Sequence, residues 1–320
     1  MNRIIPRWDG YSHWMAQNGA IERLLGAGAG WARMLAAVAG DLAEALNPVA
    51  GNGHAPDDWL DAWDPEYIRT TLPTLRLLSD VYHRAEVRGL NNIPDEGPVL
   101  LVGNHSGGTL ISDTFVLSQA FYDHFGPLRR FHQLAHDLVF QLPGVRASLS
   151  RFGTLPASPK NMARALARDA ALLVYPGGDH ETYRPSWESA DIDFAGRTGF
   201  VKLAVEHDVP IVPVVAIGGQ ETALFLGRGR RFARLLRLDS LLRLNVLPAQ
   251  LGPPFGVTVL DLPGRIPLPA KITVRALPKI DLKQRLGAKP DIDEAYELVT
   301  GKMQKALSDL DAERSLPVIG

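Results

Sequence analysis

A histidine and an aspartate close together in the chain are the residues best suited to chemistry. His105 opens the run His-Ser-Gly-Gly, and Asp113 follows after seven intervening residues. A histidine beside a carboxylate can act as a general base, because the carboxylate orients the imidazole and stabilises its protonated form. The alternative is an ordinary polar loop in which His105 caps a helix, and this stretch alone favours neither use.

The residues around His105 predict a strand, a turn and a helix. Residues 98–102 are a short apolar run between two glycines, which is typical of a buried strand. Gly107 and Gly108 follow the histidine and allow the backbone to approach a ligand closely. Residues 109–120 resume an apolar pattern and predict a helix that packs on the sheet and carries Asp113.

A second stretch repeats this arrangement. Residues 171–175 predict another buried strand that ends at Gly177 and Gly178, and charged residues follow as far as Arg184. A helix at 200–207 and a third buried strand at 210–218 come next. This alternation predicts an α/β fold with a mostly parallel central sheet flanked by helices. Since parallel strands end at a common edge, we expect both glycine loops to line one crevice.

The rest of the chain predicts a helical extension before this α/β domain. We expect residues 1–80 to form an N-terminal helical region and residues 81–320 to form the α/β domain. Residues 31–46 carry apolar side chains at helical spacing, and residues 57–82 predict helix with breaks at Pro65 and Pro73. Residues 247–269 are rich in proline and glycine and predict irregular structure. A strand at 271–276 and a helix at 291–310 complete the domain.

Composition excludes several classes of function. The net charge is −1, which gives no general attraction to nucleic acid, and the absence of cysteine rules out disulfides and thiolate chemistry. No run of about 18 apolar residues could span a bilayer, and the first ten residues do not resemble a signal peptide. His132, His136 and Asp137 lie close in sequence, but the pattern lacks further ligands. We therefore expect no metal site.

An arginine-rich segment at 224–244 differs from the rest of the chain. Arg230, Arg234 and Arg237 form one stripe at helical spacing, with leucines interleaved. A basic, leucine-rich segment in a nearly neutral protein predicts a membrane-surface element. The alternative is a solvated helix face whose arginines only cover apolar surface.

In combination, four motifs resemble the glycerolipid acyltransferase superfamily, whose members are similar to lysophosphatidate acyltransferases. They are Val87–Pro94, Gly103–Gly108 with Asp113, Tyr175–Glu181 and Val209–Val214, all within less than half of the chain. The third is closest to the Pro-Gly-Gly-x-x-Glu form of the diacylglycerol-acyltransferase-like branch. Two departures stand out. The usual spacing of four residues between histidine and aspartate is seven here, and Gly177 replaces the usual acid after proline.

The resemblance implies an enzyme that moves a fatty acyl group from an acyl thioester to a hydroxyl of a glycerolipid, lysophospholipid or related lipid. It implies that His105 and Asp113 are the catalytic pair. The substrate-binding residues it implies are Ser106, Gly107, Gly108, Gly177, Gly178, Glu181 and Arg184. Backbone amides of the glycine pairs would stabilise the oxyanion, and the last two residues would position the acceptor or the donor headgroup.

The co-substrate would be acyl-CoA or an acyl-carrier protein, with no permanently bound cofactor and no nucleic acid partner. We expect a cytoplasmic protein held peripherally on the inner face of a membrane.

Two other functions remain open. A non-catalytic lipid-binding protein could keep the same fold. A lipid esterase is also conceivable, because His-Ser-Gly-Gly is similar to the oxyanion loop of esterases. That class needs a Gly-x-Ser-x-Gly elbow, which this sequence lacks, since Ser106 has Asn104 and Gly108 at the two glycine positions.

Overall fold

The computed structural model describes residues 58–108, 111–141, 145–235, 246–253, 255–259, 261, 265–316 and 318. The predicted helix at 31–46 and Arg237 lie outside these described residues. The boundary predicted near residue 80 stays a prediction.

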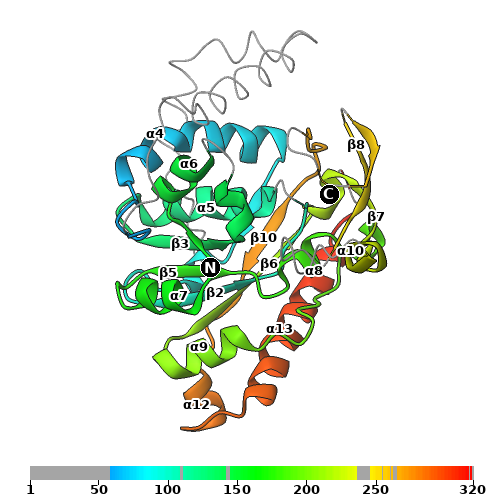
Figure 1. Cartoon of the computed structure of the whole chain (residues 1–320). Coiled ribbons are helices and arrows are strands. Elements are labelled where there is room, and N and C mark those ends of the chain that lie inside the picture. The colour runs from blue at the N-terminus through cyan, green and yellow to red at the C-terminus, as the bar shows by residue number, and fades with distance from the viewer. Residues whose placement is uncertain are drawn as a thin grey trace, which may run out of the picture. The chain divides into compact units, whose positions relative to one another are not determined.

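A seven-stranded sheet forms the centre of the described chain, in the order β1-β10-β6-β2-β5-β3-β4 (Figure 1). β2 pairs in parallel with β5 and with β6, while β10 pairs antiparallel to β6. The predicted mostly parallel sheet is therefore confirmed. Its strands are β1 Glu86–Arg88, β2 Val99–Gly103, β3 Phe131–Ala135, β4 Thr154–Pro156, β5 Ala171–Val174, β6 Ile211–Ile217 and β10 Thr273–Ala276.

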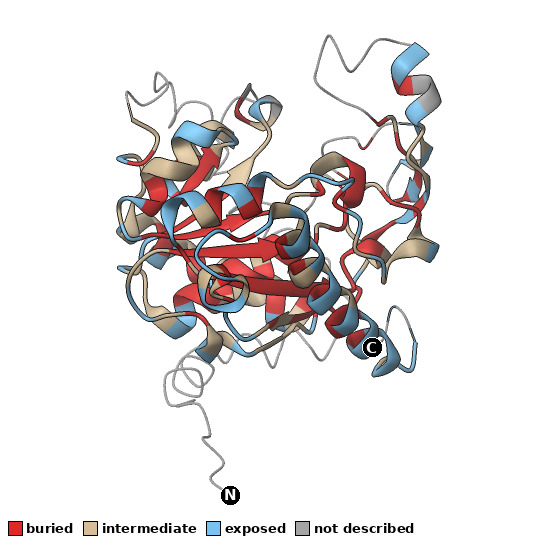
Figure 2. Cartoon of the chain, turned by 90° about the horizontal axis from the view of Figure 1, so that it is seen from below, coloured by how far each residue is buried: buried red, intermediate tan, exposed pale blue. Residues whose placement is uncertain are grey.

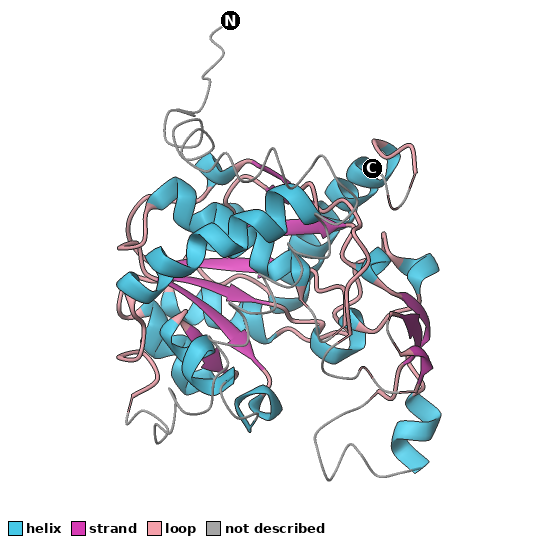
Figure 3. Cartoon of the chain, turned by 90° about the horizontal axis from the view of Figure 1, so that it is seen from above, coloured by secondary structure: helices cyan, strands magenta, loops and turns pink. Residues whose placement is uncertain are grey.

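Helices cover both faces of this sheet (Figure 3). Leu100 and Val102 of β2 pack into one core with α7, α9 and α13, whereas Val99 and Leu101 pack into the other with α4 and α5. Successive strand residues point to opposite faces, so strands that are covered on both sides must be apolar throughout. Figure 2 shows that the buried residues run along the sheet. The helices are α4 Pro65–Arg76, α5 Ser112–Phe125, α6 Val145–Arg151, α7 Pro159–Leu166, α9 Gly199–His207, α12 Leu282–Leu286 and α13 Ile292–Ala312.

Helix α4 shows that the break predicted at Pro73 was wrong. Pro65 occupies the start of the helix, where the Asp64 carboxylate caps the amides of Glu66 and Tyr67. The helix then continues through Pro73 to residue 76, and η1 Leu77–Tyr82 follows as a π-helix. The buried apolar face of α4 outweighs the single backbone hydrogen bond that the proline removes.

A second, three-stranded antiparallel sheet corrects two predictions. β7 Leu224–Gly227, β8 Ala249–Gly252 and β9 Gly256–Thr258 pair in that order. Residues 247–269 are thus not wholly irregular, and the arginine-rich segment begins as a strand before the short helix α10 Arg230–Leu235. Pairing between β7 and β8 joins residues more than twenty positions apart, so local pattern could not reveal it.

The ends of β2, β5 and β6 deliver three loops to one edge of the main sheet. Short helices shape these and other connections. They are η2 Leu90–Asn92, η3 Asp137–Gln141, α8 Gly178–Thr182, η4 Ser186–Glu188 and η5 Gln220–Thr222. Within the described part of the chain, no helix has the length and apolar character needed to cross a bilayer.

Candidate active site

His105 stands on the loop that leaves the carboxyl end of β2. Its imidazole stacks on the Tyr175 ring, with 4.2 Å between ring centroids and an angle of 15°. Tyr175 itself follows β5, so the stack joins two strand ends. A Cβ at Gly103 would lie 2.5 Å from the Tyr175 ring, which explains why the strand ends on glycine. The His105 side chain remains 14% exposed, enough to be reached by a substrate.

The carboxylate of Asp113 lies beside this imidazole. His105 Nδ1 and Asp113 Oδ2 are 3.6 Å apart, which is too long for a hydrogen bond, and Nδ1 is buried without a hydrogen-bond partner. Asp113 Oδ2 accepts the backbone N–H of Ser106 at 3.0 Å and its hydroxyl at 3.1 Å, while Oδ1 accepts the Thr114 N–H at 2.8 Å. Catalytic hydrogen bonds often tighten only when substrate binds, so the geometry is compatible with a histidine–aspartate pair.

The loop that carries His105 is held at almost every peptide group. The His105 N–H donates to Glu181 Oε2 at 2.9 Å, and the His105 carbonyl accepts from Arg184 at 3.2 Å. The Gly107 N–H donates to Gln220 Oε1 at 3.2 Å, and the Gly107 carbonyl accepts from Arg265 at 2.8 Å. These contacts come from three separate segments, so the imidazole is preorganised before any substrate arrives.

Gly108 completes the same pattern. Its N–H donates to the Thr182 carbonyl at 3.2 Å, and its carbonyl accepts from the Thr182 hydroxyl at 3.1 Å. Its φ of +69° requires glycine, and a Cβ there would lie 2.2 Å from Asp261 Oδ2. The glycine pair therefore serves close packing of the loop as well as any approach of a ligand.

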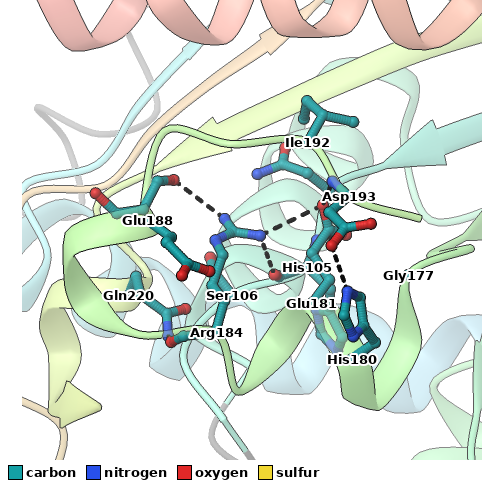
Figure 4. Close-up of polar contacts among 12 residues, drawn as sticks. His105, Ser106, Gly177, His180, Glu181, Arg184, Glu188, Ile192, Asp193 and Gln220 are labelled. Carbon is teal, nitrogen blue, oxygen red and sulfur yellow. Dashed lines mark hydrogen bonds and ion pairs between the residues drawn. The ribbon is translucent and has the colours of Figure 1, made fainter. Parts of the chain in front are cut away.

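Glu181 and Arg184 form a buried pair beneath His105. Figure 4 shows their side chains gathered at the histidine loop. Glu181 Oε1 lies 3.3 Å from Arg184 Nη1, and both side chains are fully buried. Burial raises the pKa of Glu181 to about 7, against the lowering effect of Arg184 and of the His105 and Asp193 amides. The second loop thus reaches the first one directly, as the strand-end rule predicts.

The structure corrects the position expected for Arg184. Its guanidinium does not face a site for a headgroup, because it binds the carbonyls of His105 and Ser189 inside the protein. Gln220 in turn donates to the Arg184 carbonyl. Arg184 therefore supports the histidine loop from inside the protein.

The glycine amides expected near an oxyanion are mostly occupied. Gly107 and Gly108 donate as described above, and the Gly178 N–H donates to the Tyr175 carbonyl at 3.1 Å. The fourth glycine amide expected near the oxyanion is that of Gly177. A Cβ on Gly177 would lie 2.5 Å from Glu181 Oε2, so only glycine allows this close approach.

Ser106 is placed as a structural residue. Its hydroxyl donates to Asp113, and its side chain packs so closely that a Cβ on Gly219 would lie 2.2 Å from Oγ. Its side chain is buried, with 1% exposed. A hydroxyl in this position helps to fix Asp113 and the turn after β2.

His132, from the other histidine cluster singled out from the sequence, is a structural residue. His132 is buried, and its Nδ1 lies 2.9 Å from the Gly153 carbonyl. Burial lowers the pKa of His132 to about 4. The ring is therefore neutral near pH 7 and acts as a core residue.

The arginines of the predicted membrane stripe are not all alike. Arg230 contacts His180, whose ring also meets Asp193, so Arg230 reaches toward the second loop. Arg234 is exposed on α10. Arg237 lies outside the described residues, so the stripe as a whole stays a prediction.

Several residues at the site were not predicted from the sequence. Tyr175 was placed at a strand end and in the motif Tyr175–Glu181, but no role was expected for its ring. Gln220 lies just beyond the strand expected at 210–218, and Asp261 and Arg265 lie in the stretch 247–269 that was expected to be irregular. Arg265 Nε donates to Asp261 Oδ1 at 3.0 Å, and both side chains are buried. Their i,i+4 spacing is a weak signal, since it says nothing about burial.

The part of the chain that holds this site also matches a protein family. Residues 84–217 match the acyltransferase family, and this range holds the histidine loop, Asp113 and the buried pair. The match covers less than half of the chain. Over these residues it confirms the resemblance drawn from the sequence motifs.

The chain is also similar to curated proteins. An uncharacterized protein of Mycobacterium tuberculosis is 31% identical over 241 residues, covering 75% of this chain and 63% of that protein. A human DGAT1/2-independent enzyme synthesizing storage lipids is 30% identical over 152 residues, covering 48% of this chain and 45% of that protein. The chain thus spans less than two thirds of the length of these relatives.

Among solved structures, a 1-acyl-sn-glycerophosphate acyltransferase (PlsC) of Thermotoga maritima matches with a TM-score of 0.48 and 16% identity. The match covers 79% of this chain and 80% of that one.

Proposed function

We propose that this protein transfers a fatty acyl group from an acyl thioester to a hydroxyl of a lipid acceptor. His105 is the general base and Asp113 is its partner. The observation that carries the proposal is the position of the imidazole, 3.6 Å from a buried carboxylate on a loop fixed at nearly every peptide group. Its place within the acyltransferase match adds the reaction class.

The two ring nitrogens of His105 take different roles. Nδ1 faces Asp113, so Nε2, at the other side of the ring, takes the proton from the acceptor hydroxyl as its oxygen attacks the thioester carbonyl. The C–S bond then breaks, and the imidazolium returns the proton to the leaving thiolate. Asp113 stabilises the imidazolium between these steps, and no covalent acyl-enzyme is needed.

The acceptor we propose is a glycerolipid or a lysophospholipid, with a neutral glycerolipid favoured. The relatives named for synthesis of storage lipids support this preference. The use of Arg184 inside the protein supports it as well, because that guanidinium is not offered to a phosphate. The donor is acyl-CoA or an acyl-carrier protein, and a lipid acceptor places the enzyme peripherally at the cytoplasmic face of a membrane.

The esterase alternative loses its nucleophile in this arrangement. Ser106 is buried, and its hydroxyl donates to Asp113 rather than to a histidine. A lipid-binding protein without activity remains the second candidate. The long distance between His105 Nδ1 and Asp113 Oδ2 is the observation that favours it.

Acyl transfer can be tested with purified full-length protein. Labelled acyl-CoA or acyl-carrier protein is offered with diacylglycerol, monoacylglycerol or lysophosphatidate, and the products are identified by mass spectrometry. We expect acylated acceptor from the wild type and a loss of about 10³-fold in rate for His105→Ala, since a positioned general base contributes about 10²–10⁴-fold. His124→Ala, at an exposed position on α5, is the matched control.

The outcomes separate the candidates. Free fatty acid formed without acceptor would indicate an esterase, and bound lipid without turnover would indicate a binding protein. Transfer that survives in His105→Ala would contradict the assignment of the base.

A further inference from the structure

The small sheet of β7, β8 and β9 has two different faces. Phe225 and Gln250 lie on the face toward the histidine loop, where Arg265 stacks over the Phe225 ring and Gln250 donates to Asp261 at 2.7 Å. A Cβ on Gly108 would lie 2.9 Å from the Phe225 ring. This face therefore packs directly against the catalytic loop.

The opposite face of the same sheet is apolar and exposed. Leu224, Leu251 and Val257 stand in register across the three strands, and their exposed fractions are 42%, 42% and 69%. Leu226 lies at the irregularity of β7 between Phe225 and Gly227 and is also exposed. We call these four side chains the outer face. In Figure 1, β7 and β8 stand at the right of the molecule, apart from the main sheet.

A row of exposed aliphatic side chains in register is costly in water. Isolated apolar residues on a surface are ordinary, but contiguous ones indicate a surface that meets another apolar phase. Phe255 and Val259 flank β9 and are exposed as well. The exposed apolar surface therefore continues beyond the four side chains of the outer face.

Charged and aromatic side chains are exposed on two segments next to β7. α10 begins three residues after β7, and its Arg234 and Leu235 are exposed. Trp187 is 69% exposed beside the other side of β7, where Ser186 Oγ accepts the Phe225 N–H at 2.9 Å. Aliphatic residues with arginine and tryptophan at the rim match the layers of a bilayer surface, namely acyl chains, anionic headgroups and the interface between them.

We propose that the outer face docks on the surface of an anionic phospholipid bilayer. Leu224, Leu251 and Val257 enter the acyl–headgroup boundary, and Arg234 meets the lipid phosphates. Because the sheet is one layer thick, the histidine loop behind it lies roughly 10 Å from the bilayer surface. The same sheet thereby joins membrane contact to the site, through Phe225 and the buried Asp261–Arg265 pair.

A second copy of the chain fits this surface less well. A stable protein interface buries about 800 Å² on each partner, far more than four partly exposed side chains can supply. A two-fold pairing of the outer face would also bring α10 of each copy, with its arginines, to one rim. A bilayer has neither difficulty, since its area is unlimited and its headgroups can be anionic.

Vesicle binding tests the proposal without any need for acyl transfer, so it can fail independently of the proposed function. The full-length protein is sedimented with phosphatidylcholine vesicles that contain or lack phosphatidylglycerol. We expect the double variant Leu251→Asp/Val257→Asp to bind at least ~10-fold more weakly, because it removes apolar contacts and adds charges repelled by anionic lipid. Leu128→Asp changes a leucine that is 80% exposed on the loop before β3 and should bind like the wild type.

A second variant tests the charged rim. Arg234→Gln should weaken binding about 5-fold on vesicles with phosphatidylglycerol, and leave binding to phosphatidylcholine alone unchanged. Added salt should reduce wild-type binding in the same way.

Three results would overturn the proposal. The first is wild-type protein that binds neither vesicle, and the second is a double variant that binds as well as the wild type. The third is a change in the oligomeric state of the double variant without lipid. It would mean that a second copy covers the outer face in solution.

Discussion

Replacement of Asp113 by asparagine tests the histidine–aspartate pair most directly. The substitution keeps the volume of the side chain and removes its charge. Asp113 Oδ2 accepts two hydrogen bonds from Ser106, and Oδ1 accepts two from Thr114. An asparagine has only one acceptor oxygen, so its NH₂ group must face at least one backbone N–H donor in a buried place.

The expected loss of rate follows from the distance. A full charge at 3.6 Å from the imidazolium contributes about 4.6 kcal/mol at an effective dielectric constant of about 20. That energy corresponds to a decrease in kcat of about 10³-fold. The lost hydrogen bond to a charged acceptor should also lower the free energy of unfolding by about 1.5–3 kcal/mol.

The assay must separate these two effects. Single-turnover transfer of a labelled acyl group measures the rate, and urea unfolding measures the stability. Ser106→Ala is the matched control, because it removes one hydrogen bond to Asp113 and leaves the charge in place. We expect a smaller loss of rate for that control, since a hydrogen bond to a charged acceptor contributes about 1.5–3 kcal/mol, less than the charge itself. An Asp113→Asn enzyme that keeps its rate to within a factor of about ten would refute the pair. Another acid would then have to orient His105.

Two further predictions concern the support of the loop. Gly108→Ala should lower the free energy of unfolding by more than ~2 kcal/mol, because it combines a positive φ with contacts to Asp261 and Phe225. Gly97→Ala has a similar φ of +76° and open space around its Cβ, so it should cost only about 1 kcal/mol; equal losses in urea unfolding would contradict the packing argument. Glu181→Gln should change the pH dependence of stability. The pKa of Glu181 is raised from 4.5 to about 7 on folding, so its contribution is present below pH 4.5 and is lost as pH rises through 7. The stability of the wild type relative to Glu181→Gln should therefore fall by up to about 3 kcal/mol over that range, and a constant difference would refute the shift.

The main sheet could be predicted because its strands are signalled locally. β2 and β5 are short apolar runs bounded by glycine or proline, and β6 is a longer one, so each was recognisable without knowledge of its partners. The order of parallel strands then brings their carboxyl ends together. That rule places Glu181 beside His105, and the distance of 2.9 Å from the His105 amide agrees with it.

The supports of the loop could not be predicted, because charge in a sequence does not reveal burial. Arg184 is as polar as any surface arginine, yet its guanidinium binds two backbone carbonyls in the interior. β7 and β8 were missed for a related reason. Their pairing depends on residues distant in the chain, while the arginines between them favoured a single helical interpretation.

The contacts of the histidine loop extend the functional unit beyond the family match. Residues 84–217 include His105, Asp113 and Glu181, but Gln220 and Arg265 lie outside that range. Both bind the peptide groups of Gly107, which follows the histidine by two residues. The region after β6 therefore helps to fix the position of His105, although it carries no recognisable motif. Since the same region supplies the outer face, the segment that holds the histidine loop is also the one that we expect to meet the lipid.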